Sequence, residues 1–153
     1  MKNQPVQILV SLSAPIERVW RAWTENEELT TWLTAKANVA LLVGGPYELF
    51  WEPDHPDRNS TLGCKVTAFE PMRFLAFSWR GPTEFAHLMN TEPFPTSVRV
   101  AFTETSIGET VIELEHGGWG LGPKWAEARA WQDRAWRVAF AQLETKFRTA
   151  TTN

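Results

Sequence analysis

Apolar residues recur at three- and four-residue steps from residue 123 to 147, and this spacing predicts one long amphipathic helix. Pro123 suits a first helical turn, and no later Gly or Pro interrupts the pattern. The face predicted to be buried carries Trp125, Ala128, Gln132, Trp136, Ala139 or Phe140, Leu143 and Phe147. At roughly 1.5 Å per residue this helix would be about 36 Å long, so the rest of the chain must bury it along its length.

The chain before this helix is patterned mainly in steps of two, which is typical of strands. Val6, Ile8, Val10 and Leu12 alternate with other residues and predict a first strand. Further strands are predicted at residues 37–42, 47–52, 62–69, 74–80, 98–102 and 112–116. Gly- and Pro-containing turns separate most of these segments, as expected for an antiparallel meander.

Two short helices are predicted directly after the first strand. Ser13 offers an N-cap for a helix over residues 16–24, and residues 24–27 fit a capping box for a second helix that ends near Trp32 and Leu33. The resulting order is β-α-α-β-β-β-β-β-β-α. Because strands and helices do not alternate, a doubly wound sheet is disfavoured, and we expect a single α+β domain over residues 1–153.

Composition narrows the class of protein. Hydrophobic residues make up 43% and charged residues 22% of the chain, which is typical of a globular protein. The net charge of −3 and the lack of a Lys/Arg run argue against nucleic-acid binding. The one cysteine, Cys64, excludes an intrachain disulfide and is expected to be a small buried residue. With no membrane span and no convincing signal peptide, a cytoplasmic protein is expected.

Tryptophan is unusually abundant, with nine Trp and nine Phe against one Tyr. These rings can fill a core, or several of them can line a cavity for an apolar ligand. In the second interpretation, the indole N–H groups and His116 would orient a polar end of the ligand. The predicted ligand-binding residues are Trp32, Trp51, Trp79, Phe102, His116, Trp119 and Trp125.

Catalytic and metal-binding motifs are not evident in the sequence. The histidines lack metal-ligand spacing: His55 lies in a predicted turn, and His116 lies on the inward face of the last strand, as a core residue or as a group presented to a ligand. Glu48 and Glu52 are expected to face solvent, although a register shift of one residue would turn them into the cavity. We therefore predict no catalytic residue, no metal and no cofactor.

Several short motifs occur in a characteristic order along the chain. They are APIERVW at 14–20, GGPY at 44–47, LAFSW at 75–79, HGGW at 116–119, and the spacing of Trp136, Phe140 and Leu143. From about residue 6 to 148, this order resembles the AHSA family, the homologues of the heat-shock ATPase activator. That family lies within the START-like (SRPBCC) superfamily, whose folds are also called birch-pollen-allergen-like.

The resemblance implies a helix-grip fold, in which a curved antiparallel sheet wraps a C-terminal helix and leaves a cavity between them. Superfamily members bind lipids, hormones or polyketides, or act as cyclases. Three functions stay open: binding of a small hydrophobic or amphipathic molecule in the cavity, a cyclase or hydrolase using the same cavity, and a chaperone-linked protein-interaction module. Residues 81–96 are expected to form a loop or lid, and a homodimer or partner contact would use Phe85, Leu88, Met89 and Phe94.

Overall fold

The structure, a computed structural model, describes residues 3–150. Its elements are β1 Val6–Leu12, α1 Ile16–Thr24, α2 Asn26–Leu29, β2 Lys36–Val39, β3 Tyr47–Phe50, β4 Val66–Glu70, β5 Phe74–Trp79, η1 Thr83–Phe85, α3 Ala86–Met89, β6 Thr96–Ser106, β7 Glu109–Gly117 and α4 Pro123–Ala150. The predicted order of strands and helices is confirmed. The short helices η1 and α3 are additional, in the segment that was expected to be a loop.

Five strands form an antiparallel sheet in the order β1-β7-β6-β5-β4. The inward face of its centre is buried: Val98 lies opposite His116 and Val100 lies opposite Leu114, so buried residues meet buried residues across the strands. The hairpin β2-β3 forms a separate two-stranded sheet beside the β4 edge. The two sheets are joined there by the Tyr47 amide, which donates to the Cys64 carbonyl at 2.8 Å just before β4.

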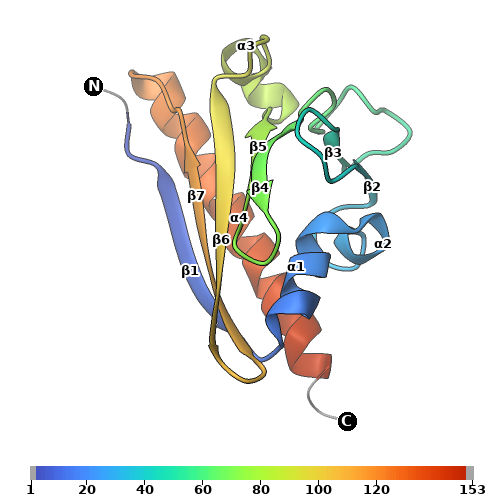
Figure 1. The fold of residues 1–153 in the computed structure, drawn as a ribbon. Helices are drawn as coiled ribbons and strands as arrows, with labels where there is room; N and C mark the ends of the chain where they lie inside the picture. The colour runs from blue at the N-terminus through green and yellow to red at the C-terminus, as the bar shows by residue number, and fades with distance from the viewer. Residues whose placement is uncertain (1–2, 151–153) are drawn as a thin grey trace.

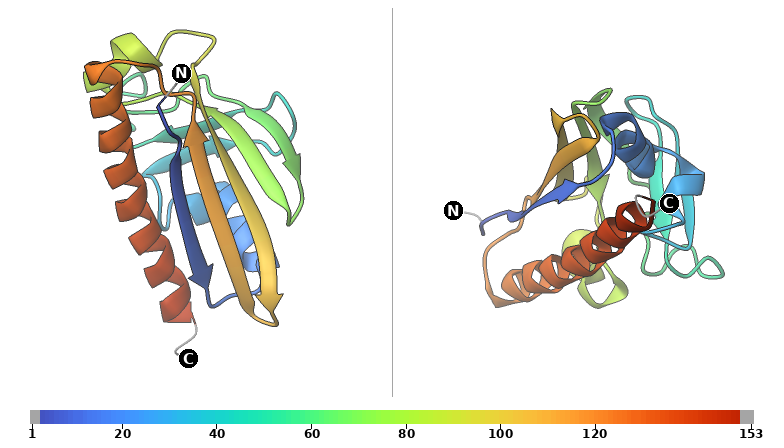
Figure 2. Two further views of the ribbon diagram at one scale, coloured as in Figure 1. Left: turned by 90° about the vertical axis from the view of Figure 1, so that its left-hand side faces the viewer. Right: turned by 90° about the horizontal axis from the view of Figure 1, so that it is seen from below.

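Helix α4 runs along one face of the sheet, as Figure 2 shows from two directions. Its buried side chains include six of the positions that the sequence spacing predicted, namely Ala128, Gln132, Trp136, Phe140, Leu143 and Phe147, whereas Trp125 is only half-buried. The short helices α1 and α2 lie beside the C-terminal part of α4, and α3 lies at the opposite end of the sheet (Figure 1). The long helix is therefore enclosed on one side by the strands and at both ends by short helices.

The caps predicted for the two short helices are wrong. The residue preceding α1 is Pro15, and no side chain caps that helix, while Ser13 is exposed. Helix α2 starts after Glu25 and ends at Leu29 rather than near Leu33. The side chains of Thr30 and Thr31 bond back to the carbonyl groups of the preceding turn, at 3.0 and 2.6 Å, which competes with further helical hydrogen bonds.

Strands β2, β3 and β4 are each two or three residues shorter than predicted, and the difference shapes the region around β3. Strand β2 ends at Val39 and strand β3 at Phe50, so Trp51 lies outside the sheet. Strand β4 starts at Val66 because a turn precedes it, closed by the Cys64 amide donating to the Thr61 carbonyl and containing Gly63 at a φ of 86°. The residues between β3 and β4 thus form a long connection at one edge of the sheet.

Candidate functional site

A cavity of about 510 Å³ lies between α4, the end of β5 and the connection that follows β3. The wall on the side of α4 consists of Trp131, Gln132, Ala135, Trp136, Val138, Ala139 and Gln142. The opposite wall consists of Trp32, Leu33, Trp51, Asn59, Ser60, Trp79, Arg80, Gly81 and Pro82. Aromatic and aliphatic side chains dominate this surface, and Arg80 is the charged residue among them.

Three of the seven residues predicted to bind a ligand, Trp32, Trp51 and Trp79, lie on the cavity wall. They come from segments far apart in the sequence: the turn after α2, the end of β3 and the end of β5. Trp51 and Trp79 meet edge to face with their ring centroids 6.1 Å apart, so the two rings form one continuous aromatic surface on the wall opposite α4.

The other four predicted residues, Phe102, His116, Trp119 and Trp125, do not line the cavity. Phe102 packs edge-on against Trp20 at 5.1 Å between ring centroids, inside the core. The ring centroid of Trp119 lies 4.6 Å from that of His116 and 6.3 Å from that of Trp125. Phe102 therefore packs against α1, and the rings of His116, Trp119 and Trp125 pack against one another and against α4. The open space lies instead beside the end of β5 and the connection after β3.

His116 is a core histidine rather than a group presented to the cavity. It is fully buried, and its Nδ1 accepts a hydrogen bond from Trp136 Nε1 at 3.0 Å. Burial lowers the pKa of His116 to about 3, because the charged ring would lose its hydration. The ring is therefore neutral near pH 7 and carries its proton on Nε2.

The indole N–H groups of the wall are mostly engaged inside the protein. Trp32 donates to the Ala22 carbonyl and Trp51 to the Leu33 carbonyl, both at 2.8 Å. The expectation that these groups orient a ligand is therefore wrong for Trp32 and Trp51, because an indole has a single N–H to donate. Their ring faces and edges are what they offer to the cavity.

Trp79 and Trp136 also use their indole N–H groups within the protein. Trp79 donates to Gln132 Oε1 at 3.2 Å, and Trp136 donates to His116 as described above. The sequence spacing predicts that Gln132 lies on the buried face of α4, and the structure adds its contact with Trp79. The sequence signal was a lone amide residue at a regular position of an otherwise apolar stripe, between Ala128 and Trp136.

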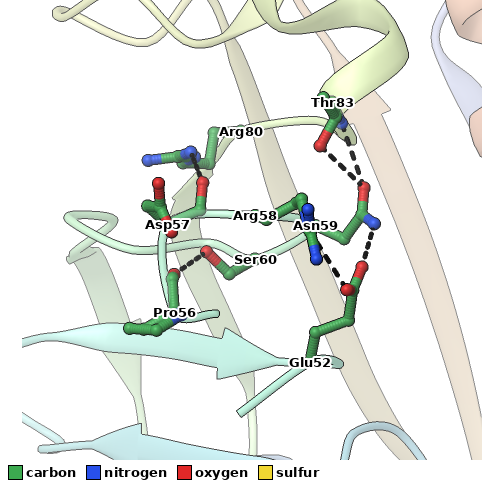
Figure 3. A network of polar contacts seen from close by, with 8 residues as sticks. All are labelled: Glu52, Pro56, Asp57, Arg58, Asn59, Ser60, Arg80 and Thr83. Atoms are coloured by element: carbon green, nitrogen blue, oxygen red, sulfur yellow. Dashed lines mark hydrogen bonds and ion pairs between the residues drawn. The ribbon is translucent and has the colours of Figure 1, made fainter. Parts of the chain in front are cut away.

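A polar network fixes the connection after β3 to the segment after β5, as Figure 3 shows. Asn59 lies at its centre: its Oδ1 accepts from the Thr83 amide at 3.0 Å, and its Nδ2 donates to Glu52. The hydrogen bond from Asn59 lowers the pKa of Glu52, with a further contribution from Arg58. Arg80 donates to the Asp57 carbonyl at 2.8 Å, so two residues of the wall, Asn59 and Arg80, hold this rim in place.

Residues 81–96 do not present the predicted apolar patch. Phe85 and Met89 are buried, while Leu88 and Phe94 are half-buried. The ring centroid of Phe85 lies 6.5 Å from that of Trp131 on α4. The physical reason is the clamp made by Asn90, which accepts from the Gly81 amide at 2.7 Å and donates to the Gly81 carbonyl at 3.0 Å. This clamp folds the segment back, so its apolar side faces the protein.

The remaining candidate polar residues lie away from the cavity. Glu48 accepts hydrogen bonds from Asn38 and from the Gly63 amide, both at 2.8 Å, on the outer side of β3. His55 is exposed, and no group of three His, Cys, Asp or Glu residues among residues 3–150 is arranged to hold a metal ion. Cys64 is buried, which raises its pKa to about 12 and keeps the thiol protonated.

Comparison with known families agrees with this architecture. The family model for activator of Hsp90 ATPase homolog 1-like protein matches residues 13–148. The chain belongs to this family. The family resemblance and the helix-grip fold inferred from the sequence are thereby confirmed. A comparison with curated proteins gave no match.

Solved structures of similar fold span nearly the whole chain. A protein from Mesorhizobium loti is 24% identical, with 96% of this chain and 99% of that chain covered and a TM-score of 0.71. An HSP90 activator from Plasmodium falciparum is 18% identical, with coverages of 94% and 95% and a TM-score of 0.70. The Aha1 dimer from Colwellia psychrerythraea is 18% identical, with the same coverages and a TM-score of 0.67. None of the helices within residues 3–150 is long and apolar enough to cross a membrane.

Proposed function

We propose that the protein binds a small, mainly apolar molecule in the cavity beside α4. The observation that carries this proposal is the wall itself: about 510 Å³ of space bordered by five of the nine tryptophans. Ligand pockets typically have volumes of roughly 300–1,000 Å³ and mostly apolar linings. Two apolar wall residues, Trp51 and Val138, are 40% and 64% exposed, so a ligand that covers them would remove apolar surface from water.

An enzyme of the cyclase or hydrolase type has less support from the same cavity. General acid–base catalysis needs a group that gains or loses a proton within hydrogen-bond reach of the reacting atom. The wall carries Arg80 but no carboxylate and no imidazole, and His116 lies behind Trp136. The geometry therefore favours binding over turnover.

A role as a chaperone-linked interaction module is supported by the similarity in fold to the Plasmodium falciparum HSP90 activator, at 18% identity. The surface expected to carry such an interaction is reduced, because Phe85 and Met89 are buried. Self-association through residues 81–96, as a homodimer, stays a prediction. Sedimentation velocity of the wild-type chain over a range of concentrations tests it directly.

The binding proposal is tested by titrating intrinsic tryptophan fluorescence with fatty acids, polycyclic aromatic compounds and polyketide-like phenols. Saturable quenching or a spectral shift is expected for at least one class, because Trp51 and Trp79 border the cavity. The variant Ala135→Phe should abolish this signal, since Ala135 lies on the wall and a phenyl ring there would occupy the space.

The matched control is Ala141→Phe, which places the same ring on the exposed side of α4, away from the cavity. Ala141→Phe should bind like the wild-type chain. Equal binding by both variants would place the ligand elsewhere, and silence of the wild-type chain across all three compound classes would refute the proposal.

A further inference from the structure

Gln132 is a buried polar residue on the wall of an apolar cavity. Its side chain is 3% exposed, and it lies midway along the cavity side of α4. Ser60, the other buried polar residue of the wall, has its hydroxyl engaged with the Pro56 carbonyl at 2.6 Å. Gln132 differs because a hydrogen bond within residues 3–150 engages only the oxygen of its amide.

Trp79 decides which end of the Gln132 amide is available. An indole N–H can only donate, so the group that Trp79 contacts at 3.2 Å must be the amide oxygen. The amide nitrogen of Gln132 is thereby turned away from Trp79 and has two hydrogens to donate. In residues 3–150, the side-chain polar atoms that are fully buried and have no hydrogen-bond partner are Trp23 Nε1, Arg80 Nε, Thr96 Oγ1 and His116 Nε2. The amide nitrogen of Gln132 also has no partner within these residues but is not one of the fully buried atoms. It therefore still reaches open space, and at this position the open space is the cavity.

We propose that Gln132 makes the cavity selective for ligands that present a hydrogen-bond acceptor, such as a carbonyl oxygen, on a flat apolar skeleton. This inference rests on the proposed binding function and adds the class of ligand to it. The flat skeleton follows from the rings of Trp51, Trp79 and Trp136, which offer surfaces for stacking and edge contacts. The acceptor follows from the donor-only character of the free end of Gln132.

Discrimination arises because burying an unpaired donor is unfavourable. A ligand with a carbonyl oxygen at this point satisfies the Gln132 amide, whereas an apolar ligand of the same shape covers it and leaves its hydrogens without a partner. The expected effect is at least about fivefold in relative affinity, or about 1 kcal/mol, the usual net value of one neutral hydrogen bond. A ligand that offers only donors at this point gains nothing from Gln132.

Fluorenone and fluorene form a matched pair of probes, because they share a rigid tricyclic skeleton and differ by one carbonyl oxygen. Their dissociation constants are measured by equilibrium dialysis with the wild-type chain, Gln132→Met, Gln132→Leu and the surface control Gln7→Met. The ratio of the fluorene constant to the fluorenone constant should fall at least about fivefold in both Gln132 variants. It should not change in Gln7→Met, since Gln7 is exposed on β1.

Infrared spectroscopy of bound fluorenone supplies a readout that a purely structural role would not move. The carbonyl stretching frequency should be lowered in the wild-type complex by the hydrogen bond and should return toward its unbonded value in Gln132→Met. An unchanged affinity ratio together with an unchanged frequency in the variants would overturn the inference while leaving cavity binding intact. Failure of the wild-type chain to bind either probe or any other tested compound would instead overturn the proposed function, and this inference with it.

Discussion

At the scale of single residues, His116 couples the core to pH. Its pKa is about 3 in the folded chain and about 6.5 in an unfolded one, so below pH 6.5 the unfolded state binds a proton that the native state does not. The free energy of unfolding should therefore be fully retained above pH 6.5. It should fall as the pH drops toward 3, by up to about 1.4 kcal/mol per pH unit.

Urea denaturation between pH 7 and 4.5 measures this effect, with His116→Gln as the comparison. A glutamine oxygen can accept the hydrogen bond of Trp136 in place of Nδ1 but does not titrate. In the variant, the free energy of unfolding should depend less steeply on pH, by the amount that corresponds to about one proton taken up on unfolding. Parallel curves for the two chains would contradict the assignment of a neutral core histidine.

Trp136 tests the packing of α4. Its ring lies 5.1 Å from that of Trp79 and 6.1 Å from that of Trp23, and it is buried. Trp136→Ala should reduce the free energy of unfolding by about 3–5 kcal/mol, because a large cavity would remain among these rings. Chemical denaturation measures the loss. Val138→Ala, on the exposed part of the same helix, should stay within about 0.5 kcal/mol of wild type, and a loss below about 1 kcal/mol in Trp136→Ala would contradict the helix orientation.

Sequence periodicity places residues on a face of an element, but it does not tell which large rings leave a gap between them. Trp32, Trp51 and Trp79 line the cavity, whereas Trp119 and Phe102 are packed in the core, although all five were equally good candidates. The difference depends on which rings from distant segments meet. The hydrogen-bond partner of each indole N–H, such as the Ala22 carbonyl for Trp32, likewise cannot be predicted from the local sequence pattern.

At the scale of elements, the passage from β7 to α4 depends on Gly118. This residue has a φ of 97°, and a Cβ atom there would collide with the Pro95 carbonyl oxygen. Gly118→Ala should reduce the free energy of unfolding by at least about 2 kcal/mol, since positive φ alone is unfavourable for alanine by about 1–2 kcal/mol.

The neighbouring glycine provides the control for Gly118. At Gly117 the φ is not positive, and an added Cβ would meet only the Pro5 side chain at 3.6 Å, an ordinary contact. Gly117→Ala should therefore change the free energy of unfolding by less than about 0.5 kcal/mol in the same denaturation assay. Equal losses in the two variants would show that the hinge does not require the left-handed backbone at Gly118.

The connection between β3 and β4 is fastened to the segment after β5 through Asn59. Asn59 has a φ of 49°, so glycine is the replacement that keeps the backbone unstrained while removing the side-chain hydrogen bonds. In Asn59→Gly the Thr83 amide loses its acceptor and should exchange its hydrogen at least about fivefold faster. The Phe102 amide, bonded to the Arg73 carbonyl at 2.8 Å, is the internal control and should exchange at the wild-type rate.

Element type was predictable wherever one periodicity ran undisturbed, as in β6, β7 and α4. Element ends were less predictable, because they depend on hydrogen bonds between distant residues. Strand β4 starts later than predicted because the Cys64 amide donates a hydrogen bond to the Thr61 carbonyl, which closes a turn before the strand. The helices between β5 and β6 were missed because Pro82 and Pro93 gave that segment the composition of a loop.

At the scale of the whole molecule, occupancy of the cavity should stabilise the fold. Fluorenone at ten times its dissociation constant should add about 1.4 kcal/mol to the free energy of unfolding, because it binds the native state only. For a chain of this size, the midpoint of thermal unfolding should rise by about 3–6 °C. Differential scanning calorimetry measures the shift. Ala135→Phe should show none, and an equal shift in that variant would indicate binding outside the cavity.

The overall architecture was the most predictable level, since one long helix after seven strands leaves few ways to bury both. The motifs from residue 14 to 143 strengthened that prediction through their order. The position of the open space was not predictable. It depends on how completely His116, Trp119 and Phe102 fill the centre of the sheet, and therefore on packing rather than on pattern.

Two different faces of helix α4 have different roles. Phe140 and Phe147 hold the scaffold together, whereas Ala135 and Ala139 border the open space. Exchanging these two small side chains for other sizes would remodel the shape of the chamber and leave the anchoring rings untouched. Under the proposed binding function, one or two point mutations at these positions would change which ligands fit, without a change in the framework of the fold.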